Sequence, residues 1–225
     1  TACNLGCPEC PSGLKMFSRP TGNIDTGDFR SWIDQVSKHA IHLNFYFQGE
    51  PFIHRDFLTM VSHAHSRGMF TSTSTNGHFI SESVANEIIT SGLDQIIISI
   101  DGVTQEVYEQ YRVHGNMEKV IEASKLLVLA KRKLQSSTPH LIFQFLAVKP
   151  NEHEIPQVFE LANAIGIDEV RSKTAQLYDF ENGNPLMPEN EKYSRYIWYI
   201  FPIFIFLYSL SDCISLLFRV SISVN

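Results

Sequence analysis

The stretch GLDQIIISIDG, residues 92–102, decides the fold class of this chain. Residues 95–100 are almost continuously apolar, as in a strand whose two faces are both covered in a parallel sheet. Gly92 stands between a helical pattern and this strand, and glycine suits the left-handed residue that often ends a helix. The stretch therefore predicts a buried strand of a parallel sheet.

The same order of helix, glycine and strand repeats along the chain, with Gly68 and Gly166 in the place of Gly92. Residues 11–24 are aperiodic and are predicted to form a loop. Helical spacing of apolar residues predicts helices at 29–40, 57–64, 84–89, 117–128 and 155–162. Strands are predicted at 41–48, 69–75, 95–100, 141–148 and 167–173. Such repeats predict an α/β fold, a parallel sheet with outer helices.

Polar side chains gather on one face of a predicted strand, where His42, Asn44, Tyr46 and Gln48 alternate with apolar residues. A closed eight-stranded barrel packs apolar side chains into its interior. A polar inner face therefore favours a wider or incomplete barrel that holds a polar ligand. Two alternatives stay open, an open doubly wound sheet and a polar face that simply meets water.

Composition narrows the classes of function. The 225 residues can bury one large core, and the net charge of −6 without a basic run does not indicate nucleic-acid binding. Four cysteines, three of them clustered, differ from a secreted disulfide scaffold, so a reducing, cytoplasmic setting is expected. The chain has no signal-peptide pattern and does not begin with Met, and we expect an N-terminally truncated fragment that lacks its first strand.

Three cysteines lie close together as Cys3, Cys7 and Cys10, with the spacing C-x3-C-x2-C. Each thiolate could bind one iron of a cubane [4Fe–4S] cluster, which would leave the fourth iron open, although four thiolates are usual. Two other interpretations remain open at this point. One is a zinc site of three cysteines and a histidine, and the other is a disulfide with one thiol left over.

The predicted strands end in polar turns, where parallel α/β proteins bind their ligands. Gly49 and Pro51 bend the chain so that backbone carbonyls and Glu50 can face an ammonium group. Ser99 and Asp101 share a strand face and can hydrogen-bond a ribose diol. The turns after the strands are 48–51, 75–77, 99–102 and 149–154.

The cysteine spacing, followed in order by these turns, resembles the radical S-adenosylmethionine (SAM) superfamily over residues 1–175. That resemblance implies a partial (βα)6 barrel of parallel strands with outer helices. It implies that the metal ligands are Cys3, Cys7 and Cys10. It implies that the residues around SAM are Gln48, Gly49, Glu50, Pro51, Asn76, Ser99 and Asp101.

The same resemblance implies an activity. A [4Fe–4S] cluster would receive one electron from a donor and cleave SAM to a 5′-deoxyadenosyl radical, which would abstract hydrogen from a substrate. The segment 151–154, Asn-Glu-His-Glu, resembles the SPASM-related subgroup, which modifies peptides and proteins or makes cofactors. The substrate class is therefore a peptide, a protein or a small molecule. The alternatives are a zinc-stabilised or cofactor-free binding module and an inactive truncated product.

Two residues depart from the family pattern. Glu9 precedes the last cysteine of the motif, where the family often has an aromatic or apolar residue that touches the adenine. Gln48 replaces the first glycine of the Gly-Gly-Glu-Pro segment. The histidines are predicted to lie mostly at the surface: His39, His42, His54, His63, His65, His78, His114, His140 and His153.

The composition changes sharply near the end of the chain. Residues 176–196 resemble a linker toward an absent C-terminal domain, and residues 197–225 are almost wholly apolar. The uninterrupted apolar run is shorter than the roughly 20 residues that cross a bilayer, and extending it would bury Asp212. A membrane helix is therefore not expected, and we expect non-native sequence there.

Overall fold

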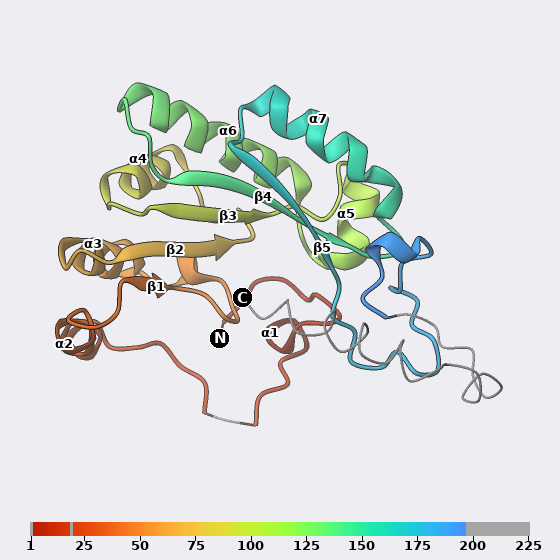
Figure 1. Ribbon diagram of the computed structural model, residues 1–225, viewed down its shortest axis with the longest axis horizontal. Coiled ribbons are helices and arrows are strands. Elements are labelled where there is room, and N and C mark those ends of the chain that lie inside the picture. Colours follow the sequence, from red (N-terminus) through yellow and green to blue (C-terminus); the bar gives the residue numbers. More distant parts are fainter. Residues whose placement is uncertain (1, 19, 197–225) are drawn as a thin grey trace, which may run out of the picture. The chain divides into compact units, whose positions relative to one another are not determined.

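The computed structural model of the chain describes residues 2–18 and 20–196. Five strands form one sheet in chain order, and every neighbouring pair is parallel (Figure 1). The strands are β1 His42–Asn44, β2 Phe70–Thr75, β3 Gln95–Ser99, β4 His140–Ala147 and β5 Glu169–Thr174. The predicted α/β fold with a parallel sheet is confirmed.

Helices precede or connect all of these strands. The α-helices are α1 Pro11–Leu14, α2 Thr26–Val36, α3 Phe57–Ser66, α4 Glu82–Thr90, α5 Gln105–Tyr111, α6 Met117–Lys133 and α7 Ile155–Ile165. Short 3-10 turns are η1 Pro51–Ile53, η2 Glu152–Glu154 and η3 Glu191–Tyr193. Each strand therefore connects to the next through a helix, as parallel pairing requires.

The two faces of the sheet differ in chemistry. Ile98 of β3 and Phe143 of β4 are fully buried in a core that they form with residues of α3, α4, α6 and α7. On the opposite face the strand register places Ser99 beside Gln144, and Gln144 beside Arg171. The sheet therefore has an apolar face under the helices and a second face that carries a polar row.

Local sequence signals explain where many helices begin and end. Side chains that accept hydrogen bonds from the first turn cap four helices, each cap contributing about 1 kcal/mol: Asp25, Ser81, Thr104 and Asn116. The three glycines predicted between helix and strand have φ values of 75°, 80° and 94°: Gly68, Gly92 and Gly166. These left-handed conformations are the ones that favour glycine.

Three local predictions were wrong or incomplete. The strand predicted at 41–48 contains only His42–Asn44, because the following residues turn toward the cysteine loop, where Glu50 N donates to Ala2 O at 2.8 Å. The predicted loop 11–24 contains the short helix α1, which has a proline in its first turn. Helix α5 was not predicted, since its seven residues are too few to show a helical repeat.

The segment after β5 has little regular structure, as expected, but it is well packed. Residues up to Arg195 belong to the same compact unit as the sheet. Leu177, Leu186 and Met187 are buried, and Lys149 N donates to Leu186 O at 3.0 Å.

The expectation for residues 197–225 lies outside the described residues. Within residues 2–18 and 20–196, no helix has the length and apolar character needed to cross a membrane.

Replacing Ile98 by alanine should destabilise the fold by about 2–5 kcal/mol, because the side chain is fully buried beneath the helices. Denaturant unfolding measures this cost. The matched control is Ile41→Ala, at a side chain that is 84% exposed, for which a change within about 0.5 kcal/mol is expected. Equal effects at the two positions would contradict the assignment of the core.

Candidate cofactor site

A cavity of about 270 Å³ lies where the cysteine loop meets the carboxyl ends of the strands. Eight predicted site residues line it: Cys3, Cys7, Cys10, Gln48, Gly49, Glu50, Asn76 and Ser99. Pro51 and Asp101 do not line it. Segments that are far apart in the sequence therefore meet at one cavity, as expected for ligand sites of parallel α/β proteins.

The three cysteines are free thiols, which excludes the disulfide alternative in this structure. Burial raises the pKa of both Cys3 and Cys7, so these thiolates need a compensating positive charge such as a metal. Among the described residues, no three Cys, His, Asp or Glu side chains converge closely enough to hold a single ion. All three thiols line one cavity, which is compatible with a cluster held by cysteine thiolates.

Helix α1 packs directly against the cysteine loop. Leu14 N donates to Cys10 O at 2.9 Å, and Cys10 N donates to Cys7 O at 3.2 Å. A Cβ atom at Gly13 would lie 2.5 Å from both the backbone N and the backbone O of Cys7. Only glycine allows this close approach, so Gly13 fixes the fold of the loop that presents the sulfurs.

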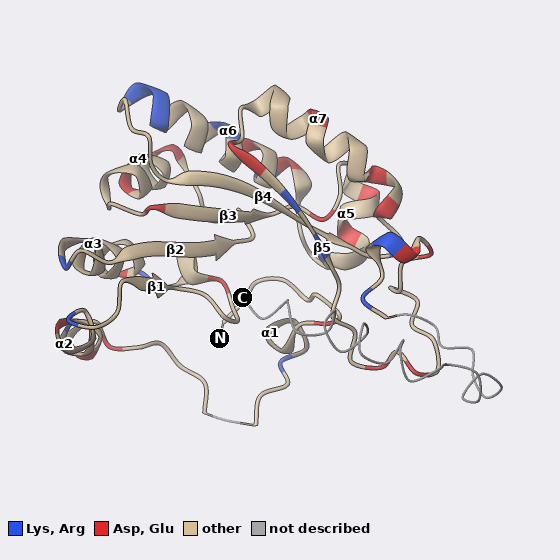
Figure 2. Ribbon diagram, in the orientation of Figure 1, with Lys and Arg blue, Asp and Glu red and all other residues tan. Residues whose placement is uncertain are grey.

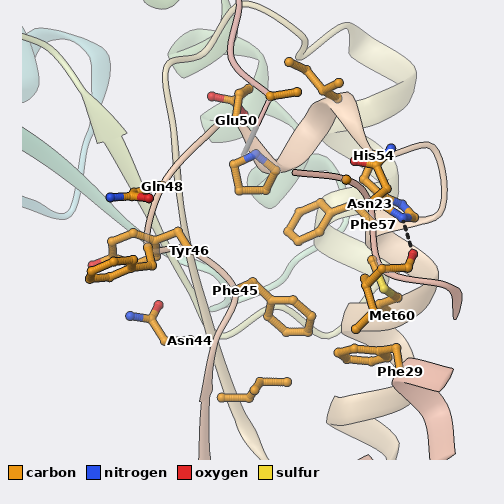
Figure 3. A pocket seen from close by; sticks show the side chains of 17 residues that line it. Asn23, Phe29, Asn44, Phe45, Tyr46, Gln48, Glu50, His54, Phe57 and Met60 are labelled. Atoms are coloured by element: carbon orange, nitrogen blue, oxygen red, sulfur yellow. Dashed lines mark hydrogen bonds between the residues drawn. The ribbon is translucent and has the colours of Figure 1, made fainter. Parts of the chain in front are cut away.

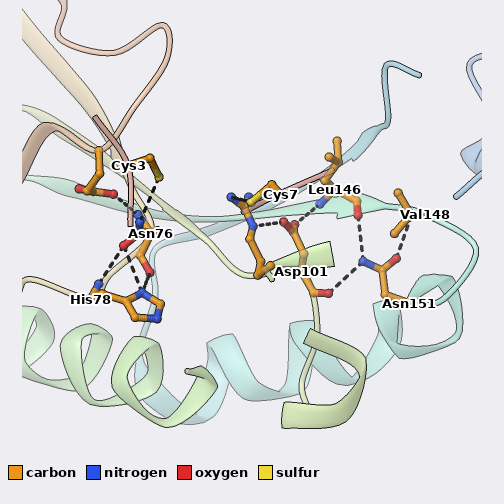
Figure 4. A network of polar contacts seen from close by, with 10 residues as sticks. Cys3, Cys7, Asn76, His78, Asp101, Leu146, Val148 and Asn151 are labelled. Atoms are coloured by element: carbon orange, nitrogen blue, oxygen red, sulfur yellow. Dashed lines mark hydrogen bonds and ion pairs between the residues drawn. The ribbon is translucent and has the colours of Figure 1, made fainter. Parts of the chain in front are cut away.

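Two side-chain N–H groups reach the cysteine sulfurs (Figure 4). Asn76 Nδ2 lies 3.8 Å from Cys3 Sγ, and Arg112 Nη1 lies 3.7 Å from Cys7 Sγ. Asn76 directly follows β2, whereas Arg112 ends helix α5. Because α5 was not predicted, the sequence offered no signal for Arg112.

Asp101 is fully buried behind the cavity and orients Arg112. Its carboxylate accepts hydrogen bonds from Arg112 Nε at 2.5 Å and from Leu146 N at 2.6 Å. Asn151 Nδ2 donates to the backbone oxygens of Asp101 and Leu146 (Figure 4). In this structure both carboxylate oxygens of Asp101 have partners inside the protein, Arg112 and Leu146 N, and the ribose contact stays a prediction.

The pair of Asp101 and Arg112 is charged. Burial raises the pKa of Asp101, and the adjacent guanidinium opposes that rise. Burial alone would lower the pKa of Arg112, but Asp101 and Cys7 raise it well above its ordinary value. A guanidinium is not deprotonated in proteins, so the site holds a fixed positive charge next to Cys7.

Glu50 fixes the turn after β1. Its buried carboxylate accepts hydrogen bonds from Thr75 Oγ1 at 2.8 Å, Asn76 N at 2.7 Å and Phe52 N at 3.3 Å. Burial raises the pKa of Glu50, and these hydrogen bonds oppose the rise. Gly49 has a φ of 93°, which explains a glycine at this position. The carboxylate therefore joins the Gly-Glu-Pro turn to the end of β2.

A second cavity of about 440 Å³ adjoins the same turn (Figure 3). Aromatic side chains such as Phe29, Phe45 and Phe57 form much of its wall. The residues that line both cavities are Tyr46, Phe47, Gln48 and Glu50. The turn after β1 therefore separates a cavity that contains the cysteines from a larger, more aromatic one.

Gln144 is a further residue of the cysteine cavity. Its Oε1 atom is buried and has no hydrogen-bond partner. A buried acceptor without a partner is unfavourable, which marks a position where a bound molecule can donate a hydrogen bond. The sequence did carry a signal here, because Gln144 interrupts the apolar strand predicted at 141–148.

Fold and site together define an α/β protein with a cavity, lined by three free thiols, at the carboxyl ends of its parallel strands. The family model described as the Radical SAM superfamily matches residues 1–162. The chain belongs to the radical SAM superfamily, a membership that implies a [4Fe–4S] cluster and SAM as cofactors.

The chain is similar to several curated enzymes. It is 27% identical over 192 residues to the PqqA peptide cyclase of Gluconobacter oxydans, covering 84% of this chain and 52% of the relative. It is 26% identical over 165 residues to the AdoMet-dependent heme synthase of Methanosarcina barkeri, covering 73% and 45%. The chain therefore spans about half the length of the curated relatives that it matches.

Solved structures confirm the fold as a partial barrel. Streptococcus suis SuiB bound to S-adenosylmethionine superposes with a TM-score of 0.65 at 13% identity, over 97% of this chain and 44% of SuiB. Native anSMEcpe with bound AdoMet superposes with a TM-score of 0.64 at 19% identity, over 86% of this chain and 52% of anSMEcpe.

Replacing Gly13 by alanine should strongly reduce iron binding, because the added Cβ would force Cys7 out of place. Iron content after anaerobic reconstitution measures the loss, and circular dichroism checks that the sheet domain stays folded. The matched control is Gly22→Ala, where a Cβ would have no neighbour within 4 Å. Wild-type iron content in Gly13→Ala would contradict the proposed packing of α1 on the loop.

Proposed function

We propose that the chain is the catalytic core of a radical SAM enzyme that cleaves SAM reductively and abstracts hydrogen from a substrate. The observation that carries this proposal is the set of three free thiols around one cavity at the strand ends, in a chain of this family. In the proposal Cys3, Cys7 and Cys10 hold the [4Fe–4S] cluster.

When bound, the cluster supplies one electron that breaks a carbon–sulfur bond of SAM, which gives methionine and a 5′-deoxyadenosyl radical. The residues of this chain bind, orient and shield the reactants. Arg112, charged and held by Asp101, lies beside the Cys7 sulfur and offsets negative charge at the thiolates. The electron itself comes from a separate one-electron donor.

SAM is proposed to lie in the cavity beside the cysteines. The turn 48–51 would receive its amino group through backbone carbonyls, since the carboxylate of Glu50 is already occupied by Thr75 and Asn76. Ser99 and Gln144 line the same cavity and offer polar atoms to the remaining groups of SAM. The unpaired Oε1 atom of Gln144 can accept one hydrogen bond from it.

A peptide or protein is the substrate class that we infer. One relative is named a peptide cyclase, and SuiB and anSMEcpe have been solved with bound peptides. The aromatic cavity in Figure 3 adjoins the cysteine cavity and provides space for a side chain near the reaction site. In this proposal residues 1–175 are the catalytic core, and 176–196 lead toward a further domain.

Anaerobic reconstitution with iron and sulfide should give a brown protein with about four irons per chain and absorbance at roughly 400 nm. After reduction, the reconstituted protein should convert SAM to 5′-deoxyadenosine. Cys7→Ala should lose both properties, because it removes one of three ligands.

Cys213→Ala is the matched control, since it removes the remaining cysteine of the chain and should leave the cluster intact. Stoichiometric zinc without the absorbance at roughly 400 nm would contradict the proposal and favour a zinc-stabilised binding module. A cluster that forms without any cleavage of SAM would reject the enzymatic part alone.

A further inference from the structure

His78 belongs to a hydrogen-bond network that ends at the sulfur of Cys3 (Figure 4). The sequence predicts that the histidines lie mostly at the surface, whereas His78 is half-buried between the turn after β2 and the start of α6. Its Nδ1 lies 2.8 Å from Asn76 O, and its Nε2 lies 2.8 Å from Asn116 N. The corrected placement comes from contacts that no local pattern reveals.

Two backbone groups fix the tautomer of His78. The carbonyl of Asn76 can only accept, so Nδ1 must carry the hydrogen. The N–H of Asn116 can only donate, so Nε2 must offer its lone pair. The imidazole is therefore neutral, and burial, which lowers the pKa of His78, agrees with this state.

The network also leaves one orientation for the carboxamide of Asn76. Its Oδ1 accepts from His78 N and from His78 Nδ1, both at 3.1 Å. Its Nδ2 therefore faces the other way, where it donates to Asn4 Oδ1 at 2.7 Å and lies 3.8 Å from Cys3 Sγ. Rotating the amide would place N–H against N–H on the side of His78.

We propose that His78 is a positioning residue whose Nδ1–H holds the amide of Asn76 toward Cys3, so that the N–H···S contact raises the reduction potential of the bound cluster. The inference rests on the proposed function, in which Cys3 is a cluster ligand. His78 acts only through Asn76 and touches neither the sulfur nor the substrate.

The physical basis is the charge of the sulfur ligands. Reduction adds negative charge to the cluster and its thiolates, and hydrogen bonds to the sulfurs stabilise that charge. Arg112 contacts Cys7 with an ionised donor, whereas Asn76 contacts Cys3 with a neutral one. Removing the neutral donor therefore changes the potential without removing a fixed charge from the site.

Two substitutions at His78 separate positioning from simple structural support. Gln extends an acceptor to the place of Nε2, so His78→Gln keeps the contact with Asn116 but loses the donor toward Asn76. Asn presents a donor near the place of Nδ1, so His78→Asn keeps the contact with Asn76 and loses the one with Asn116. If the imidazole of His78 only supports the structure through Asn116, the protein should tolerate His78→Gln better than His78→Asn. If the imidazole positions the amide of Asn76, the protein should tolerate His78→Asn better.

The experiment is a redox titration of the reconstituted protein without SAM, followed by electron paramagnetic resonance. At the wild-type midpoint, Asn76→Leu should lower the ratio of reduced to oxidised cluster about threefold, the scale of one hydrogen bond. At 59 mV per tenfold change this is about 28 mV. His78→Gln should shift the ratio in the same direction, and His78→Asn should stay near the wild type.

The control is His39→Gln, the same substitution at an exposed histidine, which should leave the ratio unchanged. Wild-type ratios in Asn76→Leu and His78→Gln at full iron content would overturn the inference. The inference would also be overturned if the ratio of reduced to oxidised cluster shifted as much in His78→Asn as in His78→Gln, or if both variants lost iron equally. Either result would show that the imidazole of His78 has only a structural role. A wild-type protein that binds no iron would instead reject the proposed function.

Discussion

Two buried carboxylates hold the ends of the strands around the cysteine loop, and the site depends on them. Glu50 binds Thr75 and Asn76 at the end of β2 from the turn after β1. Asp101, which lies just after β3, accepts hydrogen bonds from Leu146 N of β4 and from Arg112. A buried carboxylate must be compensated by hydrogen bonds or charge, so each one forces its partners to stay together. The strand ends are therefore joined by polar contacts as well as by the sheet.

The parallel sheet could be predicted because its signals are local. The isoleucine run at 95–100 and the glycines between helices and strands are short patterns that indicate the fold class. The short helices α1 and α5 were not predicted, because they have too few residues to repeat a helical pattern. The strand β1 was overestimated because alternation continued into residues that leave the sheet to form the turn toward the cysteines.

The site was predictable in its members but not in their roles. Eight of the ten residues that the cysteine spacing and the polar strand ends predicted line the cavity. Sequence alone could not show that Asp101 binds Arg112 or that Arg112 lies beside Cys7, a residue 105 positions earlier in the chain. Such contacts depend on how the helix after β3 packs, which is a tertiary property. Asp101, which the family motif assigns to SAM, binds Arg112 in this structure and holds its guanidinium next to Cys7.

Glu9 stands where the family often has an aromatic or apolar residue, and its hydrogen bonds explain the difference. Its carboxylate accepts hydrogen bonds from Tyr178 N at 3.0 Å and from Asn184 Nδ2 at 3.1 Å. A phenylalanine or an aliphatic residue at this position could not accept either bond, so the glutamate ties the cysteine loop to the segment that follows β5. That segment is also anchored by the buried Leu177. The loop that presents the sulfurs is thus held from two directions, by the strand ends on one side and by the chain beyond the sheet on the other.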